Sequence, residues 1–131
     1  MLQACPGDQP KTGPVYIIGY SFGGAVGCSM VDECGPQVRG CVAISWPCGW
    51  MSWALLGHHM APFRDSAKPK LWITGGEDQF ASESQSRGCF AKLAGPKDFH
   101  FVPAADHFWN ERGEITELVG VVVQWLKQQP A

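Results

Sequence analysis

Apolar residues gather in four short runs along the chain, at residues 15–18, 38–45, 71–74 and 99–102. Short, predominantly apolar runs of this kind are typical of parallel β-strands that are buried on both faces, because neither side of such a strand meets water. The pattern therefore predicts four buried β-strands, separated by segments of a different period.

The segments between these runs repeat apolar residues every three or four positions, which is typical of amphipathic helices. Val26, Met30 and Cys34 indicate a first helix over 25–34. A second helix is expected over 86–93, behind a capping-box pattern that begins at Ser82. Strands that alternate with helices predict an α/β fold.

The last helix is expected to start behind Asn110 as its cap and to run toward Lys127, whose charge suits the negative end of a helix dipole. With right-handed crossovers between successive strands, the whole pattern gives a parallel sheet of about four strands with helices on both faces. The apolar stripe of the last helix comprises Ile115, Leu118, Val119, Val122, Trp125 and Leu126.

Composition limits the other possibilities. The 131 residues suffice for one domain, residues 1–131, and 45% of them are apolar, which is enough for a core. A net charge of −2 gives no attraction to nucleic acid, and no stretch approaches the ~20 apolar residues of a membrane span. The first residues lack the pattern of a signal peptide, so a cytoplasmic or organellar location is expected.

Six cysteines occur without a C-x-x-C pair, which favours reduced thiols. Cys28 and Cys41 fall where a helix face and a strand place small buried residues. A zinc site made of Cys48, His58 and His59 would match no standard ligand spacing. We therefore expect neither a metal nor a cofactor.

The first predicted strand ends in Gly19-Tyr20-Ser21-Phe22-Gly23, which satisfies the pattern G-x-S-x-G. In this pattern a serine occupies a tight strand-to-helix turn, and flanking glycines avoid the crowding that a Cβ would cause. A strand before it and a helix after it provide the context that the motif requires. Ser21 is therefore a candidate nucleophile, and the backbone N–H of Phe22 is a candidate oxyanion donor.

A nucleophilic serine needs a base, and the base needs an acid that orients it. The strand at 71–74 runs into a glycine turn with Glu77 and Asp78, and the strand at 99–102 runs into a loop with Asp106 and His107. The order is serine, acid, histidine, each beyond the carboxyl end of a strand, where parallel α/β sheets place their sites.

These residues give the chain a resemblance to the C-terminal part of an α/β-hydrolase, from the strand before the nucleophile to the final helix. "GGEDQF" resembles the G-x-x-D turn after the family's seventh strand, and "ADHFW" resembles its histidine loop. The resemblance implies that Ser21 is the nucleophile, Asp78 the acid and His107 the base. It implies hydrolysis of a small ester, thioester or amide through an acyl-enzyme, without a cofactor.

Other residues are weaker candidates for these roles. Glu77 is the alternative acid, but the glycine turn of the family favours Asp78. Asp106 adjoins His107, so its carboxylate cannot reach the imidazole with suitable geometry, and capping of the loop is its simpler role. His100 lies within a strand pattern, and His58-His59 lack a partner at helical spacing.

Residues 46–68 form the one long connection and resemble a short lid-like insertion. Its tryptophans, Trp46, Trp50 and Trp53, are candidates for lining an apolar substrate pocket beside Ser21, together with Tyr20. The alternative is that these tryptophans only cover the sheet and complete the core.

The related enzymes have further strands before the nucleophile turn, and a loop among them supplies a second oxyanion donor. Residues 1–12 contain no counterpart, so we expect the strand at 15–18 to form an open edge that favours self-association. Three interpretations stay open. The chain is a serine hydrolase, or an impaired hydrolase fragment that acts as an interaction module, or a truncated isoform or gene model.

Overall fold

The computed structural model describes residues 13–50, 54 and 60–131. Four strands pair in parallel in the order in which they occur in the chain. The α/β class and the four-stranded parallel sheet predicted from the apolar runs are thus confirmed. The strands are β1 (Val15–Tyr20), β2 (Val38–Ile44), β3 (Lys70–Gly75) and β4 (Lys97–Val102).

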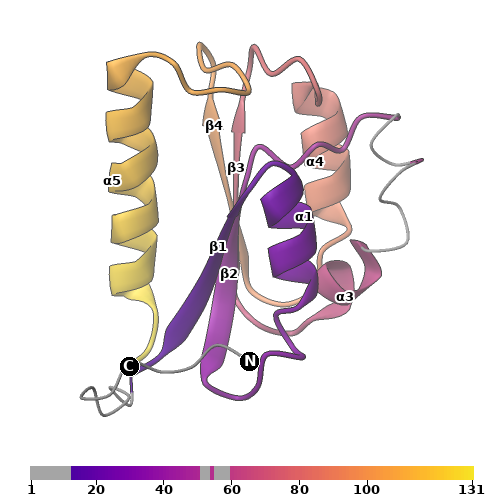
Figure 1. Ribbon diagram of the computed structural model, residues 1–131, viewed down its shortest axis with the longest axis vertical. Coiled ribbons are helices and arrows are strands. Elements are labelled where there is room, and N and C mark those ends of the chain that lie inside the picture. Colours follow the sequence, from indigo (N-terminus) through magenta and orange to yellow (C-terminus); the bar gives the residue numbers. More distant parts are fainter. Residues whose placement is uncertain (1–12, 51–53, 55–59) are drawn as a thin grey trace, which may run out of the picture.

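Helices cover both faces of the sheet, as Figure 1 shows. One face is covered by α1 (Phe22–Ser29), α3 (Met60–Asp65) and α4 (Glu83–Ala91), and the other by α5 (Arg112–Gln128). In the described part of the chain, none of the helices has the length and apolar character that crossing a membrane requires.

Alternating residues of the central strands build two separate cores. Trp72 of β3 points toward α1, α3 and α4, where Trp46 stacks on Phe63 with ring centroids 4.8 Å apart. On the other face, Leu71 and its neighbours pack against Trp125 of α5. This arrangement fits the continuous apolar runs, because a central strand that is covered on both sides exposes neither of its faces to water.

The first helix differs from the prediction. It begins at Phe22 and ends at Ser29, and Val26 and Met30 are exposed rather than buried. Its buried residues are small ones, Gly24, Ala25, Cys28 and Ser29. Small side chains let the helix axis approach the sheet closely, so this helix buries its smallest residues and the larger apolar ones face outward.

The two later helices agree with the sequence in different degrees. Ser82 is the N-cap of α4. Its hydroxyl oxygen accepts a hydrogen bond from the Gln85 N–H, and the side-chain oxygen of Gln85 accepts one from the Ser82 N–H, so the capping box is confirmed. In α5 the N-cap is Glu111, not Asn110, whose side chain instead donates to Asp106. Only part of the predicted apolar stripe of α5 is buried, with Val122 and Trp125 at its centre.

Candidate active site

Ser21 lies between the last residue of β1 and the first residue of α1. Its backbone has φ 52° and ψ −126°, which few residues other than glycine adopt. The Ser21 N–H donates to the carbonyl of Ile44 on the neighbouring strand, at 2.8 Å. A strained residue that is held by its surroundings at the end of a strand is a common feature of functional sites.

Glycine is required on both sides of this turn. A Cβ on Gly19 would lie 2.4 Å from the Cα of Gly24, and a Cβ on Gly24 would lie 2.9 Å from the Gly19 carbonyl oxygen. A Cβ on Gly23, the second glycine of the G-x-S-x-G pattern, would meet nothing within 4 Å. The crowded pair is therefore Gly19 and Gly24, and the expectation that Gly23 relieves crowding is wrong.

Three side chains from three loops meet at the carboxyl end of the sheet. The Oγ of Ser21 lies 2.8 Å from Nε2 of His107, and Nδ1 of His107 lies 2.9 Å from Oδ2 of Asp78. The side chains of His107 and Asp78 are almost fully buried, with 5% and 0% of their surfaces exposed. The structure thus brings together the serine, histidine and acid that the sequence predicts.

The loop after β3 fixes the acid. Asp78 accepts a hydrogen bond through Oδ1 from the Phe80 N–H, at 2.8 Å, which leaves Oδ2 for His107. Gly75 has no room for a side chain, because a Cβ there would lie 2.2 Å from the carbonyl oxygen of Ala105. The double glycine therefore lets the loop after β4 approach the end of β3, so that His107 reaches Asp78.

Hydrogen bonds to the carboxylate of Asp106 stabilise the loop that contains His107. Oδ1 of Asp106 accepts hydrogen bonds from the N–H groups of Phe108 and Trp109, each at 2.9 Å. The predicted role of Asp106 in steadying the loop is confirmed. The carboxamide oxygen of Gln79 accepts a further bond from the His107 N–H, at 3.2 Å.

Tyr20 ties the nucleophile strand to the histidine. Its hydroxyl donates to the carbonyl oxygen of His107 at 2.6 Å, and its ring lies 5.5 Å from the imidazole. Partial burial raises the pKa of Tyr20, and the charges of Asp78 and Asp106 raise this pKa further. The phenol therefore stays protonated, and stays a donor, above its ordinary pKa of about 10.

A second tie runs from the histidine loop to β2. The Nε1–H of Trp109 donates to Oγ of Ser45 at 2.8 Å, and both residues are buried. Both also have left-handed backbones, with φ 53° and 51°. The non-glycine residues with positive φ in the described ranges are Ser21, Ser45 and Trp109. Ser21 and Ser45 directly follow β1 and β2, and Trp109 lies in the loop after β4.

The sequence matches no family model and no curated protein sequence. Solved structures do match. The esterase domain of a Rhodothermus marinus protein aligns with 86% of the chain at a TM-score of 0.74 and 21% identity, which covers 59% of that domain's own chain. An alpha-beta serine hydrolase homologue from Coxiella burnetii aligns with 86% of the chain, at TM-score 0.68 and 20% identity, over 49% of its own length.

Dienelactone hydrolase from Anabaena variabilis aligns with 89% of the chain at a TM-score of 0.68 and 21% identity, over 50% of its own chain. The chain has part of the α/β-hydrolase fold. It spans about half of the length of these hydrolases. Identities at this level show the shared fold, and the chemistry has to be argued from the site itself.

Other candidates from the sequence lie elsewhere in this α/β-hydrolase fold. Glu77 is exposed beside the buried Asp78. The Nε2 of His100 lies 2.9 Å from a carboxylate oxygen of Glu117, on the α5 face of β4. His58 and His59 of the zinc set considered above lie outside the described residues, whereas Sγ of Cys48 lies 3.6 Å from the hydroxyl oxygen of Ser86.

The tryptophans of 46–68 have different positions in the fold. Trp46 is 4% exposed and belongs to the core around Trp72. This position agrees with the alternative that Trp46 completes the core, and not with a role in the wall of a pocket. Trp50 is 76% exposed, and Trp53 lies outside the described residues.

Two aromatic residues next to the histidine were not singled out from the sequence. The ring of Phe80 lies 4.5 Å from the imidazole of His107, and the ring of Phe108 lies 5.4 Å from it. Phe108 directly follows His107, and Phe80 lies two positions after Asp78. The sequence signal that could have identified them is the aromatic residue close to the predicted acid in "EDQF" and next to the predicted base in "DHF".

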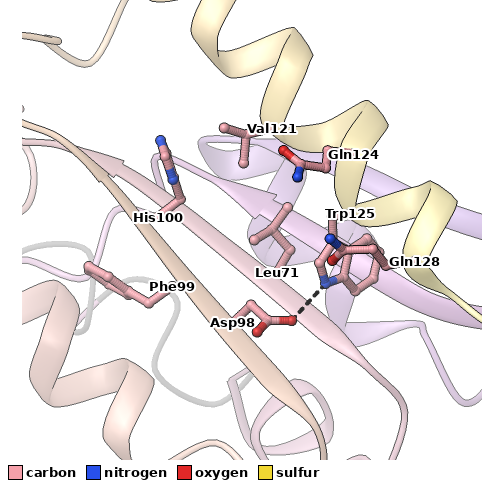
Figure 2. Close-up of a pocket in the computed structure, with 8 residues that line it drawn as sticks. All are labelled: Leu71, Asp98, Phe99, His100, Val121, Gln124, Trp125 and Gln128. Atoms are coloured by element: carbon pink, nitrogen blue, oxygen red, sulfur yellow. Dashed lines mark hydrogen bonds between the residues drawn. The ribbon is translucent and has the colours of Figure 1, made fainter.

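A hollow of about 230 Å³ lies away from these residues, between β4 and α5 (Figure 2). Its charged and titratable groups already have partners, since Asp98 accepts a hydrogen bond from the Nε1–H of Trp125 and His100 pairs with Glu117. Asp98 lies near the amino end of β4, whereas His107 follows its carboxyl end. We therefore place the candidate site at Ser21 and not in this hollow.

Proposed function

We propose that the chain is a serine hydrolase, or the part of one that contains the reacting residues, acting on a small ester, thioester or amide. The observation that carries this proposal is the pair of contacts from His107, at 2.8 Å to the Ser21 oxygen and at 2.9 Å to Asp78. This is the arrangement that lets an imidazole take a proton from a serine hydroxyl.

The proposed reaction has two halves. Asp78 accepts the Nδ1–H of His107, which leaves Nε2 free to take the proton of Ser21 while the serine oxygen attacks the carbonyl carbon. Nε2 then gives that proton to the leaving group, and an acyl-enzyme forms. In the second half, Nε2 takes a proton from water while the water oxygen attacks the acyl carbonyl carbon. Nε2 then returns this proton to the Ser21 oxygen as the bond between that oxygen and the acyl carbon breaks, which releases the acid and restores the serine hydroxyl. No cofactor is needed.

The developing oxyanion needs hydrogen-bond donors. Phe22 is the first residue of α1, and N–H groups in the first turn of a helix have no acceptor within that helix. Its N–H is therefore a suitable donor beside Ser21. The resemblance places a second donor on a loop that precedes the matched half, and the loss of one donor costs about 10²- to 10³-fold in rate. We therefore expect slow turnover with the chain alone.

Hydrolysis of 4-nitrophenyl acetate tests the proposal, because its good leaving group suits a slow enzyme. We expect a burst of about one nitrophenol per active site, followed by slower steady turnover, since deacylation then limits the rate. Ser21→Ala is expected to lose both phases, and Ser84→Ala, an exposed serine on α4, is the matched control. Hydrolysis that persists in Ser21→Ala would contradict the proposal.

A second candidate function is association, which the open edge at β1 favours. Among the described residues β1 pairs only with β2, and neither β1 nor α1 contains a charged residue. Nine of the twelve exposed large apolar residues of the described chain lie on or directly beside β1, α1 and α5. They are Val15, Ile18, Tyr20, Phe22, Val26, Met30, Ile115, Val119 and Val123.

These nine residues define an apolar face, and a second copy of this chain is the occupant that fits it best. An uncharged strand edge lacks the usual protection against pairing and accepts another uncharged edge. A two-fold axis would pair β1 with β1 and set each helix beside its own copy. Nine half-exposed large side chains offer an area on the order of the ~800 Å² that each partner contributes to a standard interface.

Light scattering after size-exclusion chromatography tests this association. The wild type is expected to be a dimer at micromolar concentration, and Ile18→Lys is expected to be a monomer, because an edge lysine prevents strand pairing. Trp50→Lys, at an exposed aromatic residue outside the apolar face, is the control and should stay dimeric. A monomeric wild type at the highest soluble concentration would overturn the association.

A further inference from the structure

Three aromatic rings surround the imidazole of His107. Tyr20, Phe80 and Phe108 contribute them, and their centroids lie 5.5, 4.5 and 5.4 Å from that of the imidazole. Phe80 and Phe108 also meet each other edge to face, at 6.4 Å. The histidine is 4% exposed, whereas Phe80 and Phe108 are 48% and 56% exposed. The rings thus cover the histidine and still present about half of their own surface to an outside molecule.

The positions of these two phenylalanines are fixed by the site itself. The N–H of Phe80 donates to Oδ1 of Asp78, and the N–H of Phe108 donates to Oδ1 of Asp106. Each ring is therefore attached to a short hydrogen-bonded turn. Aromatic rings held in this way lose little freedom when a ligand packs against them, so they suit a binding surface.

The chemistry of the proposed function decides which part of a substrate meets these rings. In that reaction, Nε2 of His107 gives its proton to the leaving group, which must come within about 2.6–3.2 Å of this nitrogen. The carbonyl oxygen of the substrate would turn toward the N–H of Phe22, the proposed oxyanion donor, and so away from Nε2. Groups that pack around the imidazole therefore border the leaving group rather than the acyl chain.

From this geometry we propose that Phe80 and Phe108 form a subsite for an apolar, aromatic-sized leaving group. The inference rests on the proposed function and deepens it, because it assigns the preferred substrates to esters or thioesters of bulky apolar alcohols or thiols. It also moves the specificity of the site from the tryptophans of 46–68 to the two turns that hold Asp78 and His107.

The test compares two acetate esters, 2-naphthyl acetate and ethyl acetate, by their kcat/KM values. Phe80→Ala and Phe108→Ala are each expected to lower kcat/KM for the naphthyl ester about 5- to 10-fold, as the loss of an aromatic contact predicts. The value for the ethyl ester should change less than about 2-fold. Phe80→Leu should lie between wild type and Phe80→Ala. Ser84→Ala, at an exposed residue on α4 outside both the site and the apolar face, is the control.

A second series separates the leaving group from the acyl chain. With 4-nitrophenyl acetate, butyrate and hexanoate, the loss in Phe80→Ala should be the same for all three, because the leaving group is constant. A loss that grows with the acyl chain, or equal losses for the naphthyl and ethyl acetates, would overturn the subsite.

A binding measurement gives a result even if the wild type shows no turnover. The fluorescence of 2-naphthol titrated with the Ser21→Ala protein should report binding, and Phe80→Ala in that background should weaken it about 5- to 10-fold. Binding without turnover would support the subsite and sink the proposed function. Turnover that depends on Ser21, with binding and kcat/KM independent of both phenylalanines, would sink the subsite and leave the proposed function standing.

Discussion

Replacing His107 by Ala is expected to lower kcat for 4-nitrophenyl acetate by about 10⁴-fold or more, because the loss of the base leaves the Ser21 hydroxyl with nothing to take its proton. The structure places its Nε2 2.8 Å from that hydroxyl. Asp78→Asn is expected to lower kcat by about 10²- to 10⁴-fold, since an amide that donates to Nδ1 shifts the ring proton to Nε2, where it blocks proton uptake.

The described part of the chain provides a matched control for these variants in a second pair of a histidine and a carboxylate. His100 and Glu117 lie 2.9 Å apart, the same separation as His107 and Asp78, but their side chains are 32% and 47% exposed. His100→Ala should leave kcat within about 2-fold of the wild type. A comparable loss in His100→Ala and His107→Ala would show that the effect is general destabilisation rather than loss of the base.

Gly19→Ala is expected to lower the free energy of unfolding by about 3 kcal/mol or more, which is at the upper end of the usual cost of overpacking. The added Cβ would lie 2.4 Å from Gly24 Cα and 2.7 Å from the carbonyl oxygen of Gly23. These are backbone atoms, so relief requires α1 to move away from β1. Such a shift also displaces Ser21, so the variant should lose activity as well.

Gly23→Ala is the matched control, two residues beyond Ser21. A Cβ there has open space and lies on the exposed side of α1, so alanine should stabilise the helix by up to about 1 kcal/mol. Urea unfolding followed by circular dichroism measures both variants. If Gly19→Ala were as stable as Gly23→Ala, the tight packing of α1 on the end of β1 would be refuted.

The sequence predicts most of the sheet and the order of the candidate site. The runs of the central strands β2 and β3 are largely buried on both faces, whereas β1 and β4 at the two edges of the sheet are partly exposed. The polar residues that follow the strands meet at one end of the sheet because all four strands run in parallel. Ser21, Asp78 and His107 therefore come together although 86 residues separate the serine from the histidine. This result depends on strand direction, which follows from the alternation of strands and helices joined by right-handed crossovers.

The details that the sequence does not predict depend on which surface packs where. The larger apolar residues of the helix predicted over 25–34, Val26 and Met30, suggest a buried stripe, yet both are exposed and Met30 lies just beyond the end of α1. The close approach of Gly24 to Gly19 decides the orientation of the helix. A periodic pattern shows that a helix has an apolar face. It does not show that another face, made of small residues, packs against the sheet in place of the apolar one.

The contacts around the histidine were also hidden from the sequence. Tyr20 is a predicted substrate-binding residue, and local spacing did not show that its hydroxyl donates to the carbonyl of His107, a contact between residues 87 positions apart. The contact between Phe80 and Phe108 was hidden for the same reason. Their rings meet only when the turns after β3 and β4 lie side by side. Such contacts are set by tertiary structure, and local spacing does not encode them.

The central claim is that Ser21 is a nucleophile activated by His107. Labelling with a fluorophosphonate probe, followed by peptide mass analysis, tests it most directly, because the probe reacts with an activated serine and needs no knowledge of the substrate. Wild type, Ser21→Ala, His107→Ala and Ser84→Ala should be compared in protein that is shown to be folded by circular dichroism.

The account predicts one adduct in the wild type, on the peptide that contains Ser21. The adduct should be absent in Ser21→Ala, strongly reduced in His107→Ala and unchanged in Ser84→Ala. A folded wild type that takes up no probe, or that takes it up at Ser21 equally well without His107, would contradict the claim that these residues form a working nucleophile.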